Sequence, residues 1–334
     1  LIVEFDAAGD VVNVDPASGP VRVAGGAEPD AVTPDPTVQT QVVDPVSAFV
    51  ASLATDVVAN SDVPLNGVRN DVRSKETNFG NLIADSQLWQ ARQLAGGFGI
   101  ADVDIALQNG GGIRNDSILP AGPLSVLDTF DALPFLNFVA VIEDVPALEL
   151  LDIIENAVSR VEPPAGFPTD GTGRFAQVAG MQIVYNVKAD PGFRVRSITL
   201  DDGTPIVQGG QPAPGAPTIN IAIADFLARG GDEYPIVSDF QILGATYQQA
   251  LENYLEDPAG LNGQVTAADY PEGGEGRIVK ADPDLTGDDL INADDLMMVL
   301  GGWGPCSGPC PTDLNGDGVT DAQDLFLLLG SWTG

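Results

Sequence analysis

The sequence contains no histidine and little positive charge, and both shortages restrict what the chain can do. None of the 334 residues is His, and 14 Lys and Arg residues stand against 48 Asp and Glu, for a formal net charge of −34. Without imidazole, the chain lacks the usual nitrogen ligand of hydrolytic metal centres. A field of this sign repels nucleic acid and anionic membranes. The composition therefore excludes nucleic acid as a partner and excludes a histidine-based metal centre.

Cysteine and long apolar runs are also scarce. The only cysteines are Cys306 and Cys310, and no zinc pattern fits them without further Cys or His. A small-loop disulfide in an exported chain and two unpaired thiols in a turn fit the spacing equally well. No apolar run approaches the roughly 20 residues of a membrane-spanning helix, so no span is predicted. The chain starts inside an expected strand, so we expect a fragment or a processed product.

The apolar residues nevertheless suffice for a folded chain with a sizeable core, at 44% of the sequence. Strand patterns occupy residues 103–107, 138–142, 181–187, 194–200 and 219–224. Helical patterns follow Asn78 and cover 245–255. Two more helices are expected after Asp44-Pro45 and after Asp144, with each Asp as the N-cap. The apolar stripe of the helix after Pro45 runs to Val57. Strands and helices without regular alternation indicate an α+β fold.

Three segments differ in composition. Residues 1–37 read as a hairpin followed by a linker rich in Pro, Asp and Gly at 25–37, and we expect them to be the trailing strands of a missing domain. Residues 38–280 carry the mixed strands and helices. Residues 281–334 form a third segment, in which a pattern beginning at Asp284 returns at Asp313, an offset of 29 residues (313 minus 284).

Each copy of this repeat has the oxygen-rich spacing of a calcium loop. Calcium takes roughly six to eight oxygens, which a loop of about 12 residues supplies from its positions 1, 3, 5, 7, 9 and 12. In the second repeat these positions are Asp313, Asn315, Asp317, the Val319 carbonyl, Asp321 and Asp324, with Gly318 at the sharp turn. The first repeat offers Asp284, Thr286, Asp288, Asn292 and Asp295. Asp289 replaces the turn glycine there, so we expect a weaker site.

The few basic residues are concentrated in one region. Arg69, Arg73, Lys75 and Arg114 are four of the 14 and lie within 46 positions. The planar guanidinium fork suits phosphate oxygens. Residues 109–112, Asn-Gly-Gly-Gly, directly follow a strand pattern, where small residues let backbone N–H groups approach an anion. Three glycines alone indicate no more than a turn, but together with the arginines they predict an anion site.

Two phenylalanines stand at abrupt changes from strand to polar loop. An isolated Phe usually belongs to a core. Phe226 follows a buried strand pattern and precedes Leu-Ala-Arg-Gly-Gly-Asp-Glu, and Phe135 ends Leu-Pro-Phe. A ring at the mouth of a cavity can stack on a base, and Asp232 can accept hydrogen bonds from ribose hydroxyls.

These motifs resemble, in order, those of the 5'-nucleotidase and UDP-sugar hydrolase family. Residues of about 38–280 are similar to its C-terminal, substrate-binding domain, with a mixed sheet, and carry Arg73…Glu76-Thr-Asn78…Gly80-Asn81…Asp85, Asn109–Arg114, Leu133-Pro-Phe135 and Phe226…Gly230-Gly-Asp232. The resemblance implies that Arg69, Arg73 and Arg114 hold the substrate phosphate, that Asn109 and Gly112 line the site, that Phe135 and Phe226 sandwich the base, and that Asp232 binds the ribose. Glu76, Asn78 and Asp85 are interpreted as structural.

The resemblance also implies where the chemistry takes place. In the family, two divalent metal ions in a preceding domain activate water, and the histidine-containing motifs of that domain are absent here. We therefore expect this chain to bind an AMP-like nucleotide or a UDP-sugar without hydrolysing it, as the nucleotide-binding half of a secreted phosphohydrolase. The alternative is a non-catalytic nucleotide-binding or adhesion module at the cell surface.

The two repeats resemble a dockerin, a small helical module with EF-hand-like calcium loops. That resemblance implies Ca²⁺ as a cofactor, folding that depends on calcium, and attachment to a cohesin-like protein partner. It further implies an extracellular, periplasmic or cell-surface location in a bacterium.

Overall fold

The computed structural model describes residues 2–20, 23–161, 172–237, 239–286, 290–306, 310–315 and 318–333. The chain separates into two compact units, Leu1–Ser52 and Leu53–Gly334. Among the described residues, no helix combines the length and the apolar character that crossing a membrane requires.

The first unit contains the predicted hairpin and a helix that begins earlier than predicted. Strands β1 (Val3–Phe5) and β2 (Val11–Val14) pair antiparallel. The helix starts as α1 (Pro36–Val38), passes through a π-helical segment (Gln39–Val43) and continues as α2 (Asp44–Leu53).

The prediction that Asp44 caps this helix is wrong. Asp35 is the cap, and its side chain accepts from the N–H groups of Thr37 and Val38, at 2.7 and 3.2 Å. Asp35-Pro36 repeats the Asp-Pro pattern inside the residues assigned to the linker, and Pro is well placed in a first helical turn. Pro45 instead lies inside the helix, where it has no N–H to donate, directly after the π-helical segment. Val57, assigned to the same stripe, belongs to a strand.

The centre of the second unit is a five-stranded sheet in the order β15-β8-β14-β5-β9. Its strands are β5 (Ile105–Asn109), β8 (Phe138–Val145), β9 (Ala176–Ala179), β14 (Ile219–Ala224) and β15 (Gln241–Thr246). Strands β5 and β14 run parallel, and the other neighbours are antiparallel. The sheet is therefore mixed, as predicted.

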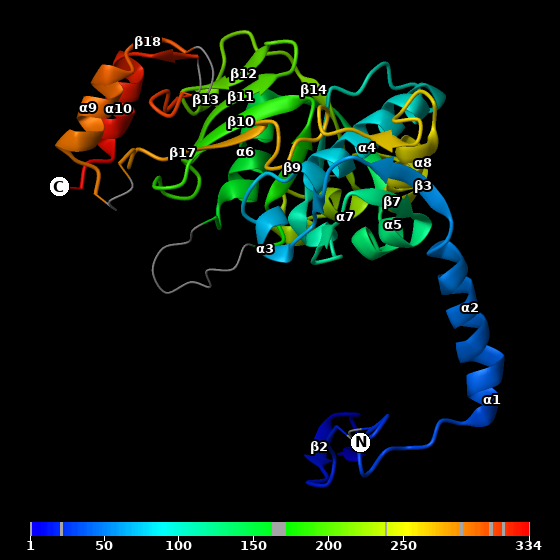
Figure 1. Cartoon of the computed structure of the whole chain (residues 1–334). Helices are drawn as coiled ribbons and strands as arrows, with labels where there is room; N and C mark the ends of the chain where they lie inside the picture. Colours follow the sequence, from blue (N-terminus) through cyan, green and yellow to red (C-terminus); the bar gives the residue numbers. More distant parts are fainter. Residues whose placement is uncertain are drawn as a thin grey trace. The chain divides into compact units, whose positions relative to one another are not determined.

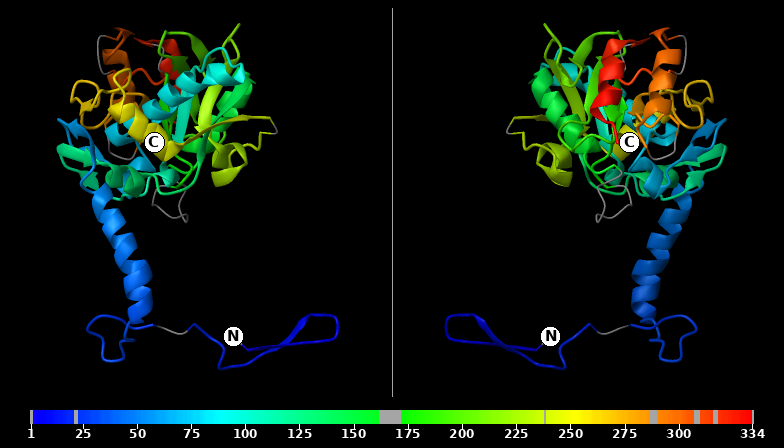
Figure 2. Two further views of the ribbon diagram at one scale, coloured as in Figure 1. Left: turned by 90° about the vertical axis from the view of Figure 1, so that its right-hand side faces the viewer. Right: turned by 90° about the vertical axis from the view of Figure 1, so that its left-hand side faces the viewer.

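The two faces of this sheet enter different cores because side chains alternate along each strand. Ala106, Val141 and Ala222 join the core shared with α4 (Asn78–Ala95), α5 (Val126–Ala132) and α8 (Tyr247–Glu256). Ile105, Leu107 and Ile221 join the core shared with α6 (Ala147–Val158). Helices α4, in cyan, and α8, in yellow, pack against each other (Figures 1 and 2).

A second five-stranded sheet, ordered β13-β12-β11-β10-β17, shares the core of α6. It consists of β10 (Met181–Asn186), β11 (Val195–Leu200), β12 (Pro205–Gln208), β13 (Gln211–Pro212) and β17 (Ile278–Ala281). Gly180 alone separates β9 from β10. Its φ is +79°, and a Cβ there would collide with the Asp104 carbonyl, so only glycine fits this corner between the sheets.

Shorter elements complete the second unit. They are β3 (Val57–Ser61), β7 (Gly122–Ser125) and β16 (Gln264–Val265) in one sheet, β4 (Leu65–Asn66) with β6 (Ile118–Leu119), and the helices α3 (Arg69–Val72) and α7 (Asp225–Ala228).

The predicted cap of α6 is also wrong. Asp144 belongs to β8, with φ at +55°, and its N–H donates to Asn220 Oδ1 at 2.9 Å. The helix begins at Ala147, after Pro146. The rigid Pro146 therefore sets the start of α6, whereas Asp144 ends the strand before it.

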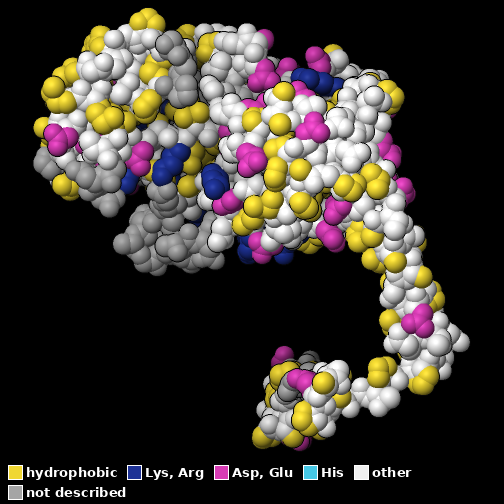
Figure 3. Space-filling model, viewed as in Figure 1, with side chains coloured by type: hydrophobic (Ala, Val, Ile, Leu, Met, Phe, Trp, Pro, Cys, Tyr) yellow, Lys and Arg dark blue, Asp and Glu magenta, His cyan; other side chains and the backbone are white. Residues whose placement is uncertain are grey.

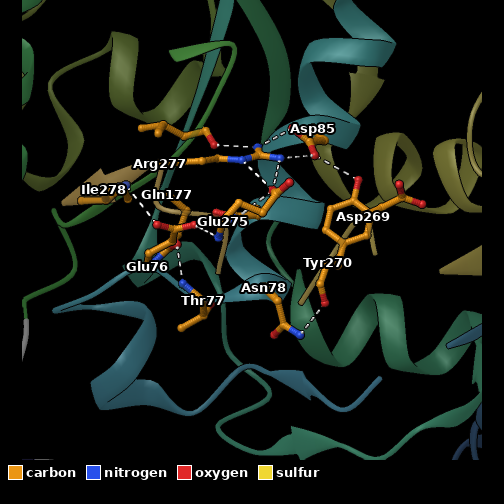
Figure 4. A network of polar contacts seen from close by, with 12 residues as sticks. Glu76, Thr77, Asn78, Asp85, Gln177, Asp269, Tyr270, Glu275, Arg277 and Ile278 are labelled. Carbon is orange, nitrogen blue, oxygen red and sulfur yellow. Dashed lines mark hydrogen bonds and ion pairs between the residues drawn. The ribbon is translucent and has the colours of Figure 1, made fainter. Parts of the chain in front are cut away.

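A polar network fixes the start of α4 against the segment that leads into β17 (Figure 4). Glu76 accepts from the backbone N–H groups of Glu275 and Ile278, at 2.6 and 3.0 Å. Asp85 accepts two hydrogen bonds from Arg277, at 2.6 and 2.9 Å, and one from the Tyr270 hydroxyl at 2.9 Å. Glu76 and Asp85 thus lie in a structural network, as interpreted from the sequence, although the N-cap of α4 is Thr77.

The duplicated segment contains one helix per repeat, α9 (Ala293–Gly301) and α10 (Ala322–Gly330). Equivalent residues, Leu285 and Leu314, Leu296 and Leu325, and Val299 and Leu328, build one small core. Strands β18 (Gly304–Pro305) and β19 (Val319–Thr320) pair between the repeats. Cys306 and Cys310 form a disulfide, which decides between the two alternatives left open by the sequence.

Candidate functional site

A cavity of about 570 Å³ opens where the parallel strands β5 and β14 end. The carboxyl ends of parallel strands meet at one edge of a sheet, and ligands commonly bind there. The residues around the cavity are Arg69, Arg73, Asn109, Gly111, Gly112, Arg114, Phe135, Leu136, Asn137, Gly173, Phe226 and Asp232. All eight residues predicted to contact a substrate are among them.

One part of the cavity wall is positively charged. Arg69 begins α3, Arg73 follows its end, and Arg114 follows the glycine turn after β5. Arg73 is only 7% exposed, and its buried Nε has no hydrogen-bond partner within the described part of the chain. Burial and the charges of Arg69 and Arg114 lower the pKa of Arg73. None of the three guanidiniums forms an ion pair with a carboxylate among the residues that the structure describes.

This concentration of positive charge contrasts with the rest of the molecule. Dark blue side chains are few on the face drawn in Figure 3, and one group of them lies at the lower edge of the second unit, where Figure 1 places α3. Asp232 and Asp116 offset part of this charge, but like charges that form no ion pair repel each other. The arrangement therefore favours an anion.

The glycine turn has a different function from the predicted one. The N–H groups of Gly110 and Gly111 donate to the carbonyls of Phe175 and Gly173, at 2.7 and 2.8 Å, so they are not available to an anion. Glycine is required because a Cβ at Gly110 would collide with the Val72 carbonyl. The turn brings α3 against the end of β5, and the expected cradle of backbone N–H groups is corrected to a close backbone contact.

Two aromatic rings form another part of the wall. Phe135 and Phe226 are 46% and 42% exposed, far more than core rings. The Arg114 guanidinium lies 5.4 Å from the centroid of Phe135, within the range of a cation–π contact. The Phe135 N–H donates to the Tyr247 hydroxyl at 3.0 Å, and burial raises the pKa of Tyr247 to about 12. Tyr247 therefore stays neutral and fixes the backbone that presents the ring.

Asp232 supplies the only carboxylate among the described lining residues. It lies in a 3-10 turn (Gly231–Glu233) after α7, with φ at +52°. Asn109 Nδ2, at the end of β5, donates to Asp232 Oδ2. No donor among the described residues is hydrogen-bonded to Oδ1, so this oxygen is available to a ligand hydroxyl.

The sequence reasoning missed three lining residues, Leu136, Asn137 and Gly173. The first two directly follow Phe135, so extending that motif by two positions would have found them. Gly173 carries no signal in the sequence and reaches the cavity only because β9 pairs with β5.

Four of the predicted calcium ligands lie where a loop meets its helix. Asn292 and Asp321 are the N-caps of α9 and α10, and each pairs with Asp295 or Asp324 in a capping box. Asp295 and Asp324 are fully buried. Asp295 accepts from Thr286 N, and Asp324 accepts from Asn315 N. Asp313 accepts from Gly318 N at 2.8 Å. Of the remaining predicted ligands, Asp284 and Val319 belong to the part of the chain that the structure describes, whereas Asp288 and Asp317 lie outside it.

The mixed sheet and this cavity define a binding domain with a cationic wall, an aromatic wall and one carboxylate. The family described as "5'-nucleotidase, C-terminal domain" matches residues 57–239, more than half of the chain. The chain belongs to this family.

Curated relatives support the same family. The trifunctional nucleotide phosphoesterase protein YfkN of Bacillus subtilis (strain 168) is 30% identical over 200 residues, covering 60% of this chain and 12% of that protein. A 5'-nucleotidase of Vibrio cholerae is 30% identical over 204 residues, covering 60% of this chain and 30% of that protein. The chain thus spans less than a third of the length of either relative.

A solved structure has the same fold over most of the chain. The 5'-nucleotidase precursor from Thermus thermophilus superposes with a TM-score of 0.58 at 28% identity, covering 83% of this chain and 48% of the other. The NAD nucleotidase of Haemophilus influenzae, at 13% identity and a TM-score of 0.52, covers 83% of this chain and 47% of the other and shares the fold.

Proposed function

We propose that the cavity binds a nucleoside 5'-phosphate compound, either an AMP-like nucleotide or a UDP-sugar. The phosphate would lie on Arg69, Arg73 and Arg114, the base between Phe135 and Phe226, and the ribose at Asp232, with Asn109 and Gly112 lining the site. The observation that carries this proposal is the buried guanidinium of Arg73, whose Nε has no partner among the described residues and whose neighbours are two further arginines.

The chemistry of the cavity supports both ends of such a ligand. A hydrogen bond from a charged donor contributes about 1.5–3 kcal/mol net. Stacking contributes roughly 1–3 kcal/mol per base, by analogy with single-stranded nucleic acids. Desolvation and lost freedom oppose these gains. We expect a dissociation constant near millimolar, or about −4 to −6 kcal/mol.

The proposal predicts that Arg114→Ala weakens AMP roughly 10-fold or more and leaves adenosine within about twofold, because only AMP carries the phosphate. Phe226→Ala should weaken both ligands alike. Lys75→Ala is the matched control, since Lys75 pairs with Asp71 at 3.1 Å, is 61% exposed and does not line the cavity. Calorimetric or NMR titration of the four proteins measures these effects.

Two results would contradict the proposal. Equal loss of AMP and adenosine binding in Arg114→Ala would remove the phosphate assignment. Absence of AMP binding to the unsubstituted protein at millimolar concentration would remove nucleotide binding itself.

The proposal extends to a larger hydrolase. The matched relatives are about two to eight times as long as the segment of each that this chain covers. We therefore propose that phosphoester hydrolysis by two divalent metals takes place on residues outside this chain. The sequence has no histidine with which to hold those metals. We place the protein outside the bacterial cytoplasm, in the periplasm, at the cell surface or secreted.

Calcium is proposed for the two loops, and the second loop fits it better. Gly318 has φ at +84°, as its position in the turn requires. Burial and the nearby charge of Asp313 raise the pKa of Asp324, despite hydrogen bonds that lower it. A bound cation would neutralise this repulsion. In the described residues, no three His, Cys, Asp or Glu side chains converge, and Asp288 and Asp317 are outside that part of the chain.

Attachment to a cohesin-like protein is the second part of the proposal for the repeats. Equivalent apolar side chains of both helices are exposed, Met297 with Phe326 at 65% and 70%, and Leu300 with Leu329 at 46% and 45%. Exposed apolar patches are typical of protein interfaces.

A further inference from the structure

We propose that Glu233 and Arg174 are positioning residues for Asp232. Their ion pair holds the turn that directs Asp232 into the cavity, and so makes binding depend on the ribose hydroxyls of the ligand. This inference rests on the proposed nucleotide function and adds two residues that do not line the cavity.

The turn that carries Asp232 has an unusual backbone. Asp232 and Glu233 are consecutive residues with φ at +52° and +62°. This left-handed region is unfavourable for side chains other than glycine, and Glu lacks the local hydrogen bonding with which Asp relieves that cost. The surrounding structure must therefore hold the turn in place.

Glu233 is held by a buried cation although its own side chain is 66% exposed. Arg174 Nη2 lies 2.7 Å from Glu233 Oε2, and the Arg174 side chain is 8% exposed. The hydrogen bond and the charge of Arg174 lower the pKa of Glu233. Arg160, which is exposed, makes a longer contact to Glu233 at 3.2 Å. Arg174 is thus the principal partner.

Arg174 is itself anchored to helix α6. Its Nη1 donates to Asn156 Oδ1 at 2.9 Å and to Ser159 Oγ at 3.2 Å. Its carbonyl accepts from the buried Tyr234 hydroxyl at 2.7 Å. Asn156 also donates to the Asp232 carbonyl at 3.3 Å. The same helix therefore holds Glu233 through Arg174 and the backbone of Asp232 directly.

The opposite side of Asp232 is fixed by a chain of buried amides. Gln87 Nε2 donates to Gln108 Oε1, Gln108 Nε2 donates to Asn109 Oδ1 at 3.0 Å, and Asn109 Nδ2 donates to Asp232 Oδ2. Gln87 and Gln108 are fully buried. This side fixes one carboxylate oxygen and leaves Oδ1 for the ligand.

The carboxylate lies close to two glycines, which leave space for it. A Cβ at Gly111 would lie 3.1 Å from Asp232 Oδ2, and one at Gly173 would lie 3.0 Å from the same oxygen. Gly173 adjoins Arg174, so the residue that makes room for the carboxylate neighbours the residue that holds the turn. A small shift of the turn would therefore move Oδ1 away from its position in the cavity.

The test compares AMP with 2',3'-dideoxy-AMP, which lacks both ribose hydroxyls. We expect the unsubstituted protein to favour AMP by about tenfold, the effect of one hydrogen bond to a charged group. Glu233→Ala should reduce this ratio below about threefold and leave binding of the dideoxy ligand within about twofold. Arg160→Ala should retain most of the ratio. Glu143→Ala, an exposed acid of β8 outside the cavity, is the matched control.

The outcomes separate this inference from the proposed function. Equal weakening of both ligands in Glu233→Ala, or an unchanged ratio, overturns the positioning role. A wild-type protein that binds both ligands equally overturns it too, yet leaves nucleotide binding standing. If wild type binds neither ligand, the proposed function fails. Hydrogen exchange of the Tyr234 amide, which donates to the Gly231 carbonyl at 3.1 Å, then tests whether Glu233 holds the turn. Faster exchange in Glu233→Ala supports the role of the ion pair in holding the turn, and unchanged exchange overturns that role.

Discussion

Arg73, which is buried, and Arg277, which is partly buried, have opposite surroundings. Burial by itself would lower the pKa of Arg277, but the carboxylates of Asp85 and Glu275 bind this guanidinium and raise its pKa. At Arg73, burial and two neighbouring arginines lower the pKa. Arg277 therefore stabilises the fold, whereas the repulsion around Arg73 lowers the stability of the folded domain. A charge retained without a partner is typical of a binding site.

This contrast predicts opposite effects on stability. Arg277→Met should lower the free energy of unfolding by about 3–5 kcal/mol, because it leaves two partly buried carboxylates unpaired. Arg73→Met should be neutral or stabilising within about 1 kcal/mol, because it removes repulsion, and it should abolish AMP binding. Urea denaturation of both variants measures the difference. Comparable destabilisation by the two substitutions would show that Arg73 has a structural partner.

At this scale the sequence was informative because most predicted residues belong to a short motif. Asn109, Phe226 and Asp232 could be recognised from their neighbours, Arg69 from the concentration of basic residues, and the structure gathers them around one cavity. The roles of these residues as ligand contacts stay predictions. The residues that act on Asp232 through others could not be found in this way, since Arg174 acts through Glu233 and Gln87 through Gln108 and Asn109, and neither has a motif of its own.

At the scale of elements, the sequence located the strongly periodic helices and strands well but did not locate the helix caps. The buried strand at 219–224 appears as predicted. Asp44-Pro45 and Asp144 both have the chemistry of a helix start, yet Asp35-Pro36 and Pro146 are the actual starts. Local chemistry allowed several starts, and the sequence alone does not distinguish among them. Short strands such as β7 and β9 gave no usable signal because tertiary pairing defines them.

The repeats carry the prediction that belongs to this scale. Calcium should raise the thermal stability of residues 281–334 and protect the amides of α10 from hydrogen exchange, because the cation offsets repulsion between Asp313 and Asp324. Asp313→Ala combined with Asp324→Ala should abolish the effect at the second loop. Asp294→Ala, an exposed residue at no ligand position, is the control. Identical melting of this segment in calcium and in excess chelator would contradict the proposal.

For the whole molecule, the sequence predicted a mixed sheet but not its strand order. Strand β17 joins β10 in parallel although about 95 residues separate them, and β14 lies between β5 and β8. Such pairings depend on loop closure over long distances, which composition and periodicity do not encode.

The purified chain should not release phosphate from AMP with any divalent metal. The reason is the complete absence of histidine, since the two-metal chemistry proposed for the larger protein uses imidazole ligands. A colorimetric phosphate assay with Mg²⁺, Mn²⁺, Co²⁺ or Zn²⁺ measures this, and heat-inactivated protein is the blank. Metal-dependent release above that blank, from a preparation free of other phosphatases, would show that this chain contains a catalytic centre.

The network of Glu76 has a consequence for the order in which the protein is made. The carboxylate of Glu76 binds the N–H of Ile278, 202 residues later in the chain, and Arg73 lies three residues before Glu76. During synthesis a domain is completed only when its last strand has left the ribosome. The arginine segment is therefore made long before Ile278, and this anchor forms only after almost the entire domain has followed. A ribosome that stops before Ile278 would release a chain with its cationic residues present but their framework unfinished.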